Sequence, residues 1–256
     1  MIPLRSPIPS PSLSQKLLVL AFVGVGLYYL AWRPSVFNHD APLFSAVVYG
    51  AEVFGFACAM LYLVMCWRLQ QRTPFAPPEN ATVAVFVPTI NESVDIVRRT
   101  VMAAQRMKQA TEVWLLDDGN RLEMQVLAEE LGCRYLTRTE NSHAKAGNLN
   151  NALRHTQAEF IAIFDADHAP AQNFLEQTLG FFRDDKVAFV QTPQDFYNLD
   201  SFQHRMDRQE SLVWSEQTLF FRVIQAGKDR LNAAFFCGSC AVIRRKALED
   251  IGGFAT

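Results

Sequence analysis

Paired carboxylates follow an apolar run near the middle of the chain. The run Phe160–Phe164 leads directly into Asp165, Asp167 and His168. Such a run is typical of a buried parallel strand, whose carboxyl end opens at the ligand-binding edge of an α/β sheet. Two carboxylates one residue apart suit a Mg²⁺ or Mn²⁺ ion that keeps several waters and holds a substrate diphosphate. Asp-x-Asp also occurs in ordinary turns and helix caps, so the motif alone leaves both interpretations open.

Two earlier apolar runs end in the same way. The runs 83–87 and 112–116 are each followed by polar residues and a turn. Because parallel strands end at the same edge of a sheet, we expect the three sets of polar residues to converge there. The polar residues that follow the two runs are Thr89, Asn91, Glu92, Asp117 and Asp118.

A loop of small and polar residues, 141–148, lies between two predicted elements and opens onto a helix. It contains His143 and Lys145. A lysine beside a helix N-terminus can hold diphosphate oxygens by its charge and by the amide dipoles together. A solvated loop lysine is an equally good interpretation of this segment when it is taken by itself.

Composition limits the classes of function. Half of the 256 residues are apolar and the net charge is −2, so a sizeable core is expected and a polyanionic partner such as nucleic acid is not. The charge is unevenly divided. Residues 1–72 hold five Lys/Arg and two Asp/Glu, which leaves the remainder near −5.

The N-terminal region, 1–72, is predicted to be a membrane hairpin. Two long apolar segments, 13–32 and 43–67, can each cross a bilayer, and a cleaved signal peptide is the weaker alternative for the first. Basic residues flank the pair, whereas the connecting loop holds only one Arg and one His, so both ends are expected in the cytoplasm. Glu52 lies inside the second segment and is either a functional acid or the partner of a neighbouring helix.

A proline-rich linker, 73–82, is followed by alternating strands and helices up to the end of the chain. This order predicts an α/β domain, 83–256, with a mostly parallel sheet covered by helices on both faces. Neither a Walker loop nor Gly-x-Gly-x-x-Gly is present, which argues against P-loop nucleotidases and dinucleotide dehydrogenases. The expected strands are 83–87, 112–116, 134–137, 160–164 and 187–191, and the expected helices are 93–107, 121–131, 148–155 and 171–182.

Two other segments have patterns that allow more than one interpretation. Cys237-Gly238-Ser239-Cys240 is a lone Cys-x-x-Cys, which is weak evidence for zinc or redox chemistry and favours packing or substrate contact. The segment 201–227 is predicted to form a long amphipathic helix, which either lies at a membrane interface or packs on the sheet.

Six motifs in order resemble the catalytic domain of bacterial cellulose synthases, the processive glycosyltransferases of family 2. The resemblance extends from residue 82 to the end of the chain. One position departs from it, because Ile90 stands where the family usually has a tyrosine. The motifs are Thr-Ile-Asn-Glu (89–92), Asp-Asp-Gly (117–119), His-Ala-Lys-Ala-Gly-Asn (143–148), Phe-Asp-Ala-Asp-His (164–168), Gln-Thr-Pro (191–193) and Phe-Phe-Cys-Gly-Ser (235–239).

The resemblance implies a GT-A fold and an inverting transfer of glucose from UDP-glucose to a growing β-glucan, with Mg²⁺ or Mn²⁺ as cofactor. It also implies a site with three parts. The donor would contact Thr89, Glu92, Asp117, Asp118, His143, Lys145 and Asn148. The metal would lie at Asp165 and Asp167, with His168 beside it. The acceptor would lie along Gln191, Phe235, Phe236, Cys237, Gly238 and Ser239.

The family's catalytic base belongs to a Thr-Glu-Asp motif that is expected just beyond Thr256. We therefore expect a fragment of a longer protein of the inner membrane, which binds UDP with Mg²⁺ but does not polymerise alone. Its whole form is expected to have a lipid bilayer and cellulose-export subunits as partners. Transfer of N-acetylglucosamine to a chitin-like or hyaluronan-like polymer is the alternative activity, and a non-catalytic nucleotide-sugar-binding subunit is the alternative class.

Overall fold

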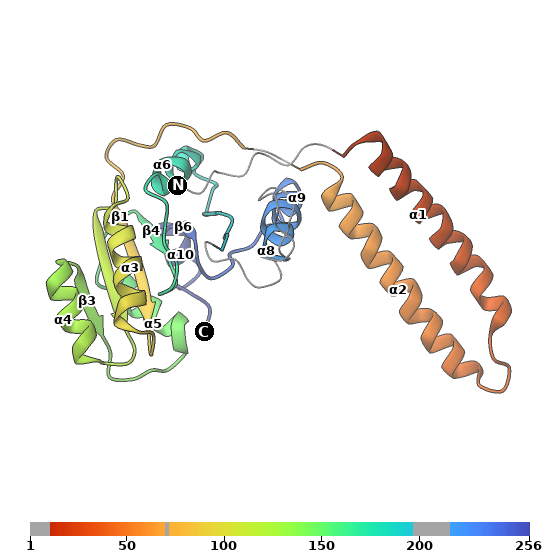
Figure 1. The fold of residues 1–256 in the computed structure, drawn as a ribbon, viewed down its shortest axis with the longest axis horizontal. Coiled ribbons are helices and arrows are strands. Elements are labelled where there is room, and N and C mark those ends of the chain that lie inside the picture. The colour runs from red at the N-terminus through yellow and green to blue at the C-terminus, as the bar shows by residue number, and fades with distance from the viewer. Residues whose placement is uncertain (1–10, 70–71, 197–215) are drawn as a thin grey trace, which may run out of the picture. The chain divides into compact units, whose positions relative to one another are not determined.

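The computed structural model describes residues 11–69, 72–196 and 216–256. These residues fall into two compact units, which are drawn in Figure 1. One unit combines the chain up to residue 71 with residues 194–234, and the other combines residues 72–193 with 235–256. Each unit is described by itself.

The first unit contains the helical hairpin that the sequence predicts. Helix α1 (Leu13–Trp32) is followed by a 3₁₀ turn, η1 (Arg33–Val36), and by α2 (Pro42–Cys66). Helix α1 begins at a capping box, in which the Ser12 hydroxyl accepts from the Gln15 amide and the Gln15 side chain accepts from the Ser12 amide. By length and composition alone, both helices are apolar enough to cross a membrane, and their apolar stretches are not buried within the protein.

Polar contacts join the two helices. Glu52 of α2 accepts a hydrogen bond from the Tyr29 hydroxyl at 2.9 Å and pairs with Arg33 at 3.2 Å. The Tyr49 hydroxyl donates to the Leu30 carbonyl at 3.1 Å. Glu52 therefore pairs with the neighbouring helix, which is the simpler of its two predicted roles.

A second helical segment completes this unit. It runs through α8 (Glu216–Leu219), a π-helical turn η3 (Phe220–Gln225) and α9 (Ala226–Arg230). Helix α9 lies close against the end of α2, because a Cβ added to Gly227 would meet the Met65 carbonyl at 2.3 Å. Arg230 donates to the Val64 carbonyl at 3.1 Å. The predicted helix 201–227 is thus confirmed over 216–227, and its first part, 201–215, lies outside the described residues.

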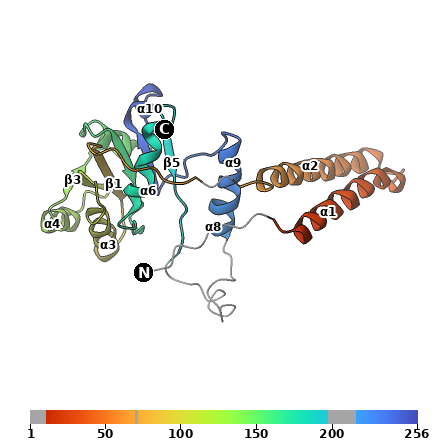
Figure 2. The ribbon, with the colours of Figure 1, turned by 90° about the horizontal axis from the view of Figure 1, so that it is seen from above.

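The second unit is built on a six-stranded sheet of order β3-β2-β1-β4-β6-β5. Figure 2 labels β3, β1 and β5 of this sheet. Neighbouring strands are parallel from β3 to β4, and β6 is antiparallel to both of its neighbours. The sheet is therefore mostly parallel, as predicted. The strands are β1 (Val83–Thr89), β2 (Glu112–Asp117), β3 (Arg134–Thr137), β4 (Phe160–Ile163), β5 (Phe189–Gln191) and β6 (Ala241–Arg244).

Helices cover both faces of the sheet because its central strands are apolar on both sides. One face packs against α3 (Val94–Gln105), α4 (Leu122–Leu131) and α6 (Phe174–Thr178). The other face packs against α5 (Ala144–Leu153) and α10 (Arg245–Asp250). All seven residues of β1 are buried, as expected for the centre of such a three-layer arrangement.

Strand β6 and helix α10 differ from the prediction, which contained neither. A four-residue strand with three apolar side chains is too short to recognise by its own pattern, and its partners β4 and β5 lie far away in sequence. Helix α5 begins at residue 144 instead of 148, after His143 in a left-handed conformation with φ 62°. The helix predicted at 171–182 is shorter and continues as a 3₁₀ turn, η2 (Leu179–Arg183).

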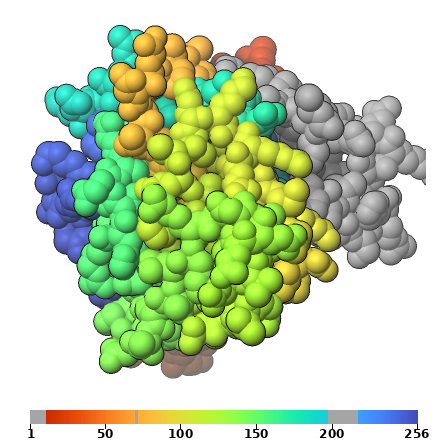
Figure 3. Space-filling view, turned by 90° about the vertical axis from the view of Figure 1, so that its left-hand side faces the viewer, coloured from red at the N-terminus to blue at the C-terminus, as the bar shows by residue number. Residues whose placement is uncertain are grey.

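The proline-rich segment 73–82 packs onto the second unit. A Cβ at Gly180 would lie 2.0 Å from the Phe75 carbonyl oxygen, so only glycine permits this approach. Arg183 lies over the Phe75 ring at 4.9 Å. Figure 3 shows this segment, in orange, lying on the surface of the unit. The segment is therefore held against the sheet domain near its first residues, at Phe75.

Candidate functional site

The carboxyl ends of β1, β2 and β4 meet at one edge of the sheet. Thr89 pairs in register with Asp117, and the Asp118 amide donates to the Thr89 carbonyl at 2.9 Å. The Phe164 amide donates to the Phe86 carbonyl at 3.0 Å, which extends the contact of this segment with β1 to the residue before Asp165. The predicted convergence of three polar strand ends is therefore present.

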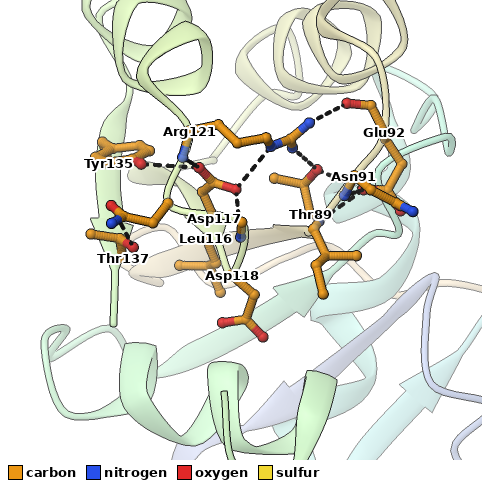
Figure 4. Close-up of polar contacts among 12 residues, drawn as sticks. Thr89, Asn91, Glu92, Leu116, Asp117, Asp118, Arg121, Tyr135 and Thr137 are labelled. Atoms are coloured by element: carbon orange, nitrogen blue, oxygen red, sulfur yellow. Dashed lines mark hydrogen bonds and ion pairs between the residues drawn. The ribbon is translucent and has the colours of Figure 1, made fainter. Parts of the chain in front are cut away.

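Asp117 lies at the centre of a closed hydrogen-bond cluster (Figure 4). Its carboxylate is fully buried and accepts from the amides of Gly119 and Arg121 at 3.0 and 2.6 Å. It also accepts from the Tyr135 hydroxyl at 3.0 Å and the Arg121 guanidinium at 3.4 Å. Burial, followed by this hydrogen bond to Asp117, raises the pKa of Tyr135 to about 12.

Arg121 connects this cluster to the end of β1. Its guanidinium donates to the Glu92 carbonyl at 2.6 Å and to the Thr89 hydroxyl at 2.8 Å (Figure 4). The Glu92 carboxylate accepts from the Thr89 hydroxyl at 2.7 Å and from the Ile90 amide at 2.9 Å. Burial alone would raise the pKa of Glu92, but these hydrogen bonds outweigh it and lower that pKa.

Thr89, Glu92 and Asp117, which are predicted to contact the donor, are therefore already bonded to one another, either directly or through Arg121. Thr89 is 4% exposed and Asp117 is fully buried, so both shape the rim of the site through Arg121. Gly119 allows this closeness, since a Cβ there would meet the Ile90 carbonyl at 2.3 Å. Sequence reasoning missed Arg121, and its one signal was its position directly after the Asp-Asp-Gly turn.

Asp118 points away from that cluster in Figure 4 and pairs with Arg138. The two groups form a bidentate ion pair with both N–O distances at 2.7 Å, and both side chains are at most 10% exposed. The hydrogen bond to Asp118 raises the pKa of Arg138 further. Arg138 also donates to the carbonyls of Ser142 and Ala144, at 2.7 and 2.8 Å. It therefore fastens the loop before α5 to the end of β2, a role that sequence reasoning missed.

Helix α5 carries three of the predicted donor residues, and they occupy different environments. His143 is exposed at the start of the helix. Asn148 is 1% exposed and donates to the Leu116 carbonyl at 3.1 Å, which ties α5 to β2. Lys145 extends toward β4, where its ammonium bonds the Asp165 carboxylate and, at 2.8 Å, the Gly238 carbonyl.

The predicted metal residues after β4 differ in their surroundings: Asp167 is open to solvent, whereas Asp165 and His168 bond the buried Ser239 hydroxyl. The Asp167 side chain is 71% exposed and lies 3.9 Å from the His168 Nε2 atom. His168 Nδ1 lies 2.7 Å from the Ser239 hydroxyl and 3.3 Å from the Cys240 sulfur. The Asp165 amide also donates to the Ser239 hydroxyl, at 2.9 Å. Ser239 is thus a buried support for both residues.

Burial raises the pKa of Cys240 to about 12, so this sulfur remains a thiol at neutral pH. A low thiol pKa is what redox chemistry by a Cys-x-x-Cys pair requires. The environment of Cys240 therefore argues against the redox interpretation of this motif.

The predicted acceptor residues form a loop that is clamped by Gln191 of β5. The Gln191 side chain accepts from the Cys237 amide and donates to the Ser239 carbonyl, both at 2.8 Å. Gly238, between these two points, has φ 87°, a conformation that favours glycine. Phe236 packs against the core, with its ring 6.4 Å from the Phe254 ring, while Phe235 is 44% exposed. The structure therefore brings the predicted acceptor loop beside the predicted metal residues.

The residues after β4 fit a hard divalent cation that is held mainly by a ligand. Asp165 and Asp167 offer carboxylate oxygens with substantial exposure, 40% and 71% of their side chains. Among the described residues no three His, Cys, Asp or Glu side chains gather as a complete metal-binding group. Mg²⁺ and Mn²⁺ sites in nucleotide enzymes commonly have few protein ligands, because water and phosphate oxygens supply the rest.

Comparison with known proteins agrees with this geometry. Residues 84–252 match the family described as Glycosyl transferase family 2. The chain belongs to this family. The chain is 42% identical over 252 residues to the UDP-forming cellulose synthase catalytic subunit of Pseudomonas fluorescens (strain SBW25). The aligned region covers 93% of this chain and 34% of that protein. The chain is also 42% identical over 214 residues to the corresponding subunit of Xanthomonas axonopodis pv. citri (strain 306), covering 80% and 29%.

A solved structure supports the fold of this family 2 chain. The mannosyltransferase PcManGT from Pyrobaculum calidifontis, in complex with GDP-Man and Mn²⁺, superposes with a TM-score of 0.54 at 22% identity. The match covers 84% of this chain and 58% of the mannosyltransferase. The second unit therefore has the GT-A fold, as the resemblance implies. The chain spans about a third of the length of the two cellulose synthase subunits.

Proposed function

We propose that this chain is the donor-binding part of a membrane-attached glycosyltransferase that moves glucose from UDP-glucose to a growing β-glucan. The observation that carries the proposal is the junction of Lys145, Asp165 and the loop 237–239 at the edge of a family 2 domain. This junction brings together a lysine that can bind phosphate, a carboxylate that can bind a metal ion and a loop that can bind the acceptor. The similarity to UDP-forming cellulose synthase subunits supports glucose as the sugar.

We assign the donor to the rim formed by β1, β2 and α5. Since Thr89 and Asp117 are bonded to Arg121, we place the uracil and ribose against the exposed residues Ile90 and Asn91 beside this cluster. Lys145 and the amides at the start of α5 would meet the diphosphate. Asn148, Asp118 and Arg138 hold the loop that presents Lys145.

Asp165 and Asp167 would hold Mg²⁺ or Mn²⁺, with His168 beside them. Such an ion, when bound, neutralises the charge that develops on a leaving diphosphate. The acceptor would lie along the exposed Phe235 ring and the clamped peptide 237–239, because a sugar face packs on an aromatic ring and its hydroxyls bond main-chain groups.

The organisation that we propose keeps the sequence boundaries: a hairpin in 1–72, a linker in 73–82 and a glycosyltransferase domain in 83–256. Helices α1 and α2 would cross the inner membrane with the domain on the cytoplasmic side, because basic residues flank the hairpin ends. In the whole protein, the β-glucan and the export subunits would be partners of this assembly.

Calorimetric titration tests the donor assignment. The full chain in detergent micelles is titrated with UDP-glucose and with UDP-N-acetylglucosamine, with and without Mg²⁺. Asp167→Asn removes one metal carboxylate, and Asp185→Asn, at an exposed position in a loop before β5, is the matched control. We expect Mg²⁺-dependent binding that prefers UDP-glucose, is lost in Asp167→Asn and is kept in Asp185→Asn.

Other outcomes would change the proposal in specific ways. Preference for UDP-N-acetylglucosamine would move the chain to the chitin or hyaluronan class. Loss of binding in both variants would show that net charge, and not the Asp167 carboxylate, governs affinity. No binding of either nucleotide by the folded chain would refute the donor site.

A further inference from the structure

One ammonium group connects three elements of the proposed site. Lys145 lies near the start of α5, and its Nζ atom bonds the carboxylate of Asp165 after β4. The same atom donates to the Gly238 carbonyl at 2.8 Å, in the loop before β6. The Lys145 and Asp165 side chains are 37% and 40% exposed, so solvent and solutes can reach both partners of this pair.

The position of this ammonium conflicts with a cation at Asp165. A carboxylate oxygen that is bonded to a lysine cannot give the same lone pair to a metal, and two positive charges at one carboxylate repel each other. A diphosphate, in contrast, attracts both the lysine and the metal. A diphosphate that arrives with a metal ion can therefore take the lysine away from Asp165, and the metal ion can take its place on the carboxylate.

We propose that Lys145 is an exchangeable counter-ion of Asp165. Its ammonium holds the carboxylate while the donor site is empty and moves to the diphosphate when metal and nucleotide bind. This inference rests on the proposed function, and it adds a role for Lys145 in the empty site that phosphate binding alone does not require.

The exchange also reaches the acceptor loop. When the ammonium leaves Asp165 it also leaves Gly238, whose peptide lies between the two points clamped by Gln191. The loop 237–239 then keeps its hydrogen bonds with Gln191 and those of the Ser239 hydroxyl with Asp165 and His168. It loses the hydrogen bond between Gly238 and Lys145 of α5. Occupancy of the donor site thus changes the restraint on the loop where we place the acceptor, and by linkage a ligand on that loop changes donor affinity.

Binding of Mn²⁺ alone, followed by electron paramagnetic resonance, tests the exchange without any enzymatic reaction. The full chain in detergent is compared with Lys145→Gln, Lys145→Arg and the control Lys108→Gln, whose lysine pairs with Glu176 at 3.0 Å instead. We expect Lys145→Gln to bind Mn²⁺ on the order of tenfold more tightly, as removal of a unit charge within about 5 Å of a divalent ion in a largely aqueous site predicts. Lys145→Arg and Lys108→Gln should bind as the unaltered chain does. Equal or weaker binding by Lys145→Gln overturns the proposal.

This result is separable from the proposed function. If the unaltered chain binds UDP-glucose with metal and Lys145→Gln gains no Mn²⁺ affinity, the counter-ion role fails and the donor site stands. If Lys145→Gln gains Mn²⁺ affinity and no chain binds UDP-glucose, the donor assignment fails and the competition between lysine and metal stands.

Hydrogen–deuterium exchange tests the effect on the loop. We expect faster exchange in a peptide covering 235–239 when Mn²⁺ and UDP are added to the unaltered chain. In Lys145→Gln the same peptide should already exchange fast without ligand, and Lys108→Gln should behave as the unaltered chain does. Slower or unchanged exchange on addition of Mn²⁺ and UDP, with binding shown by calorimetry, overturns the link to the acceptor loop.

Discussion

Replacing Arg138 by methionine removes the partner of a buried carboxylate. Asp118 accepts two charge-assisted hydrogen bonds from Arg138, both at 2.7 Å, and its side chain is 6% exposed. Leaving one member of a buried ion pair without its partner costs about 3–5 kcal/mol. The contacts of Arg138 with the Ser142 and Ala144 carbonyls add little to this loss, since both residues are exposed and water can replace the donor.

The chain contains a matched control for this change. Arg98 and Glu130 also form a bidentate pair, with N–O distances of 2.6 and 2.7 Å that are close to those of the Arg138 pair. Its side chains are 32% and 55% exposed, however, and water and salt screen the attraction of such exposed pairs, so they contribute little to stability. Arg98→Met should therefore cost far less than Arg138→Met, and burial is the physical difference between the two.

Hydrogen–deuterium exchange of the amides in β1 and β4 measures the loss, because these central strands open only with the whole sheet. We expect the free energy of opening to fall by about 3–5 kcal/mol in Arg138→Met and by much less in Arg98→Met. Adding Asp118→Asn to Arg138→Met should restore part of the loss, because the unpaired charge is gone. Equal losses in the two single variants, or no recovery in the double variant, would refute the reasoning.

Two further predictions concern titrating groups. Because burial raises the pKa of Cys240 from 9.0 to about 12, its alkylation by iodoacetamide at pH 8.5 should be roughly a thousandfold slower in the folded chain than in urea; similar rates would contradict this environment. The raised pKa of Tyr135 stabilises the fold fully below pH 10, and this contribution is lost as pH rises to about 12. Absorbance titrations of the chain and of Tyr135→Phe should differ by a phenolate near pH 12, and a difference centred at pH 10 would count against the Asp117 contact.

The predictable part of the fold is the part with long apolar runs. Strands β1, β2 and β4 are fully or nearly fully buried, so their sequences are continuously apolar and each ends at a polar turn. Strand β6 has three apolar residues and is stabilised by pairing across the sheet, as in Ala241 opposite Ile163. Such pairing is a property of the assembled sheet, and a local window of sequence contains no trace of it.

Within the candidate site, residues with a recognisable local context were predicted and their partners were not. Lys145 and Asp165 were expected in one site, and the structure brings them into direct contact. Arg121 and Arg138 were missed, because an arginine near a strand end resembles a surface residue until its carboxylate is known. A search for one basic residue per strand-end carboxylate would have found both.

The two carboxylate pairs of this chain show why motif chemistry needs the tertiary partners. Asp117 and Asp118 lie at the end of β2 much as Asp165 and Asp167 lie just after β4, and the sequence assigns ligand binding to both pairs. Arginines neutralise the first pair, which is buried and therefore serves to shape the site. The second pair has a single lysine, is open to solvent and retains capacity for a cation. The burial of the partner charge, and not the spacing of the aspartates, therefore distinguishes the two pairs, and it is the reason that we propose the second pair as the metal site.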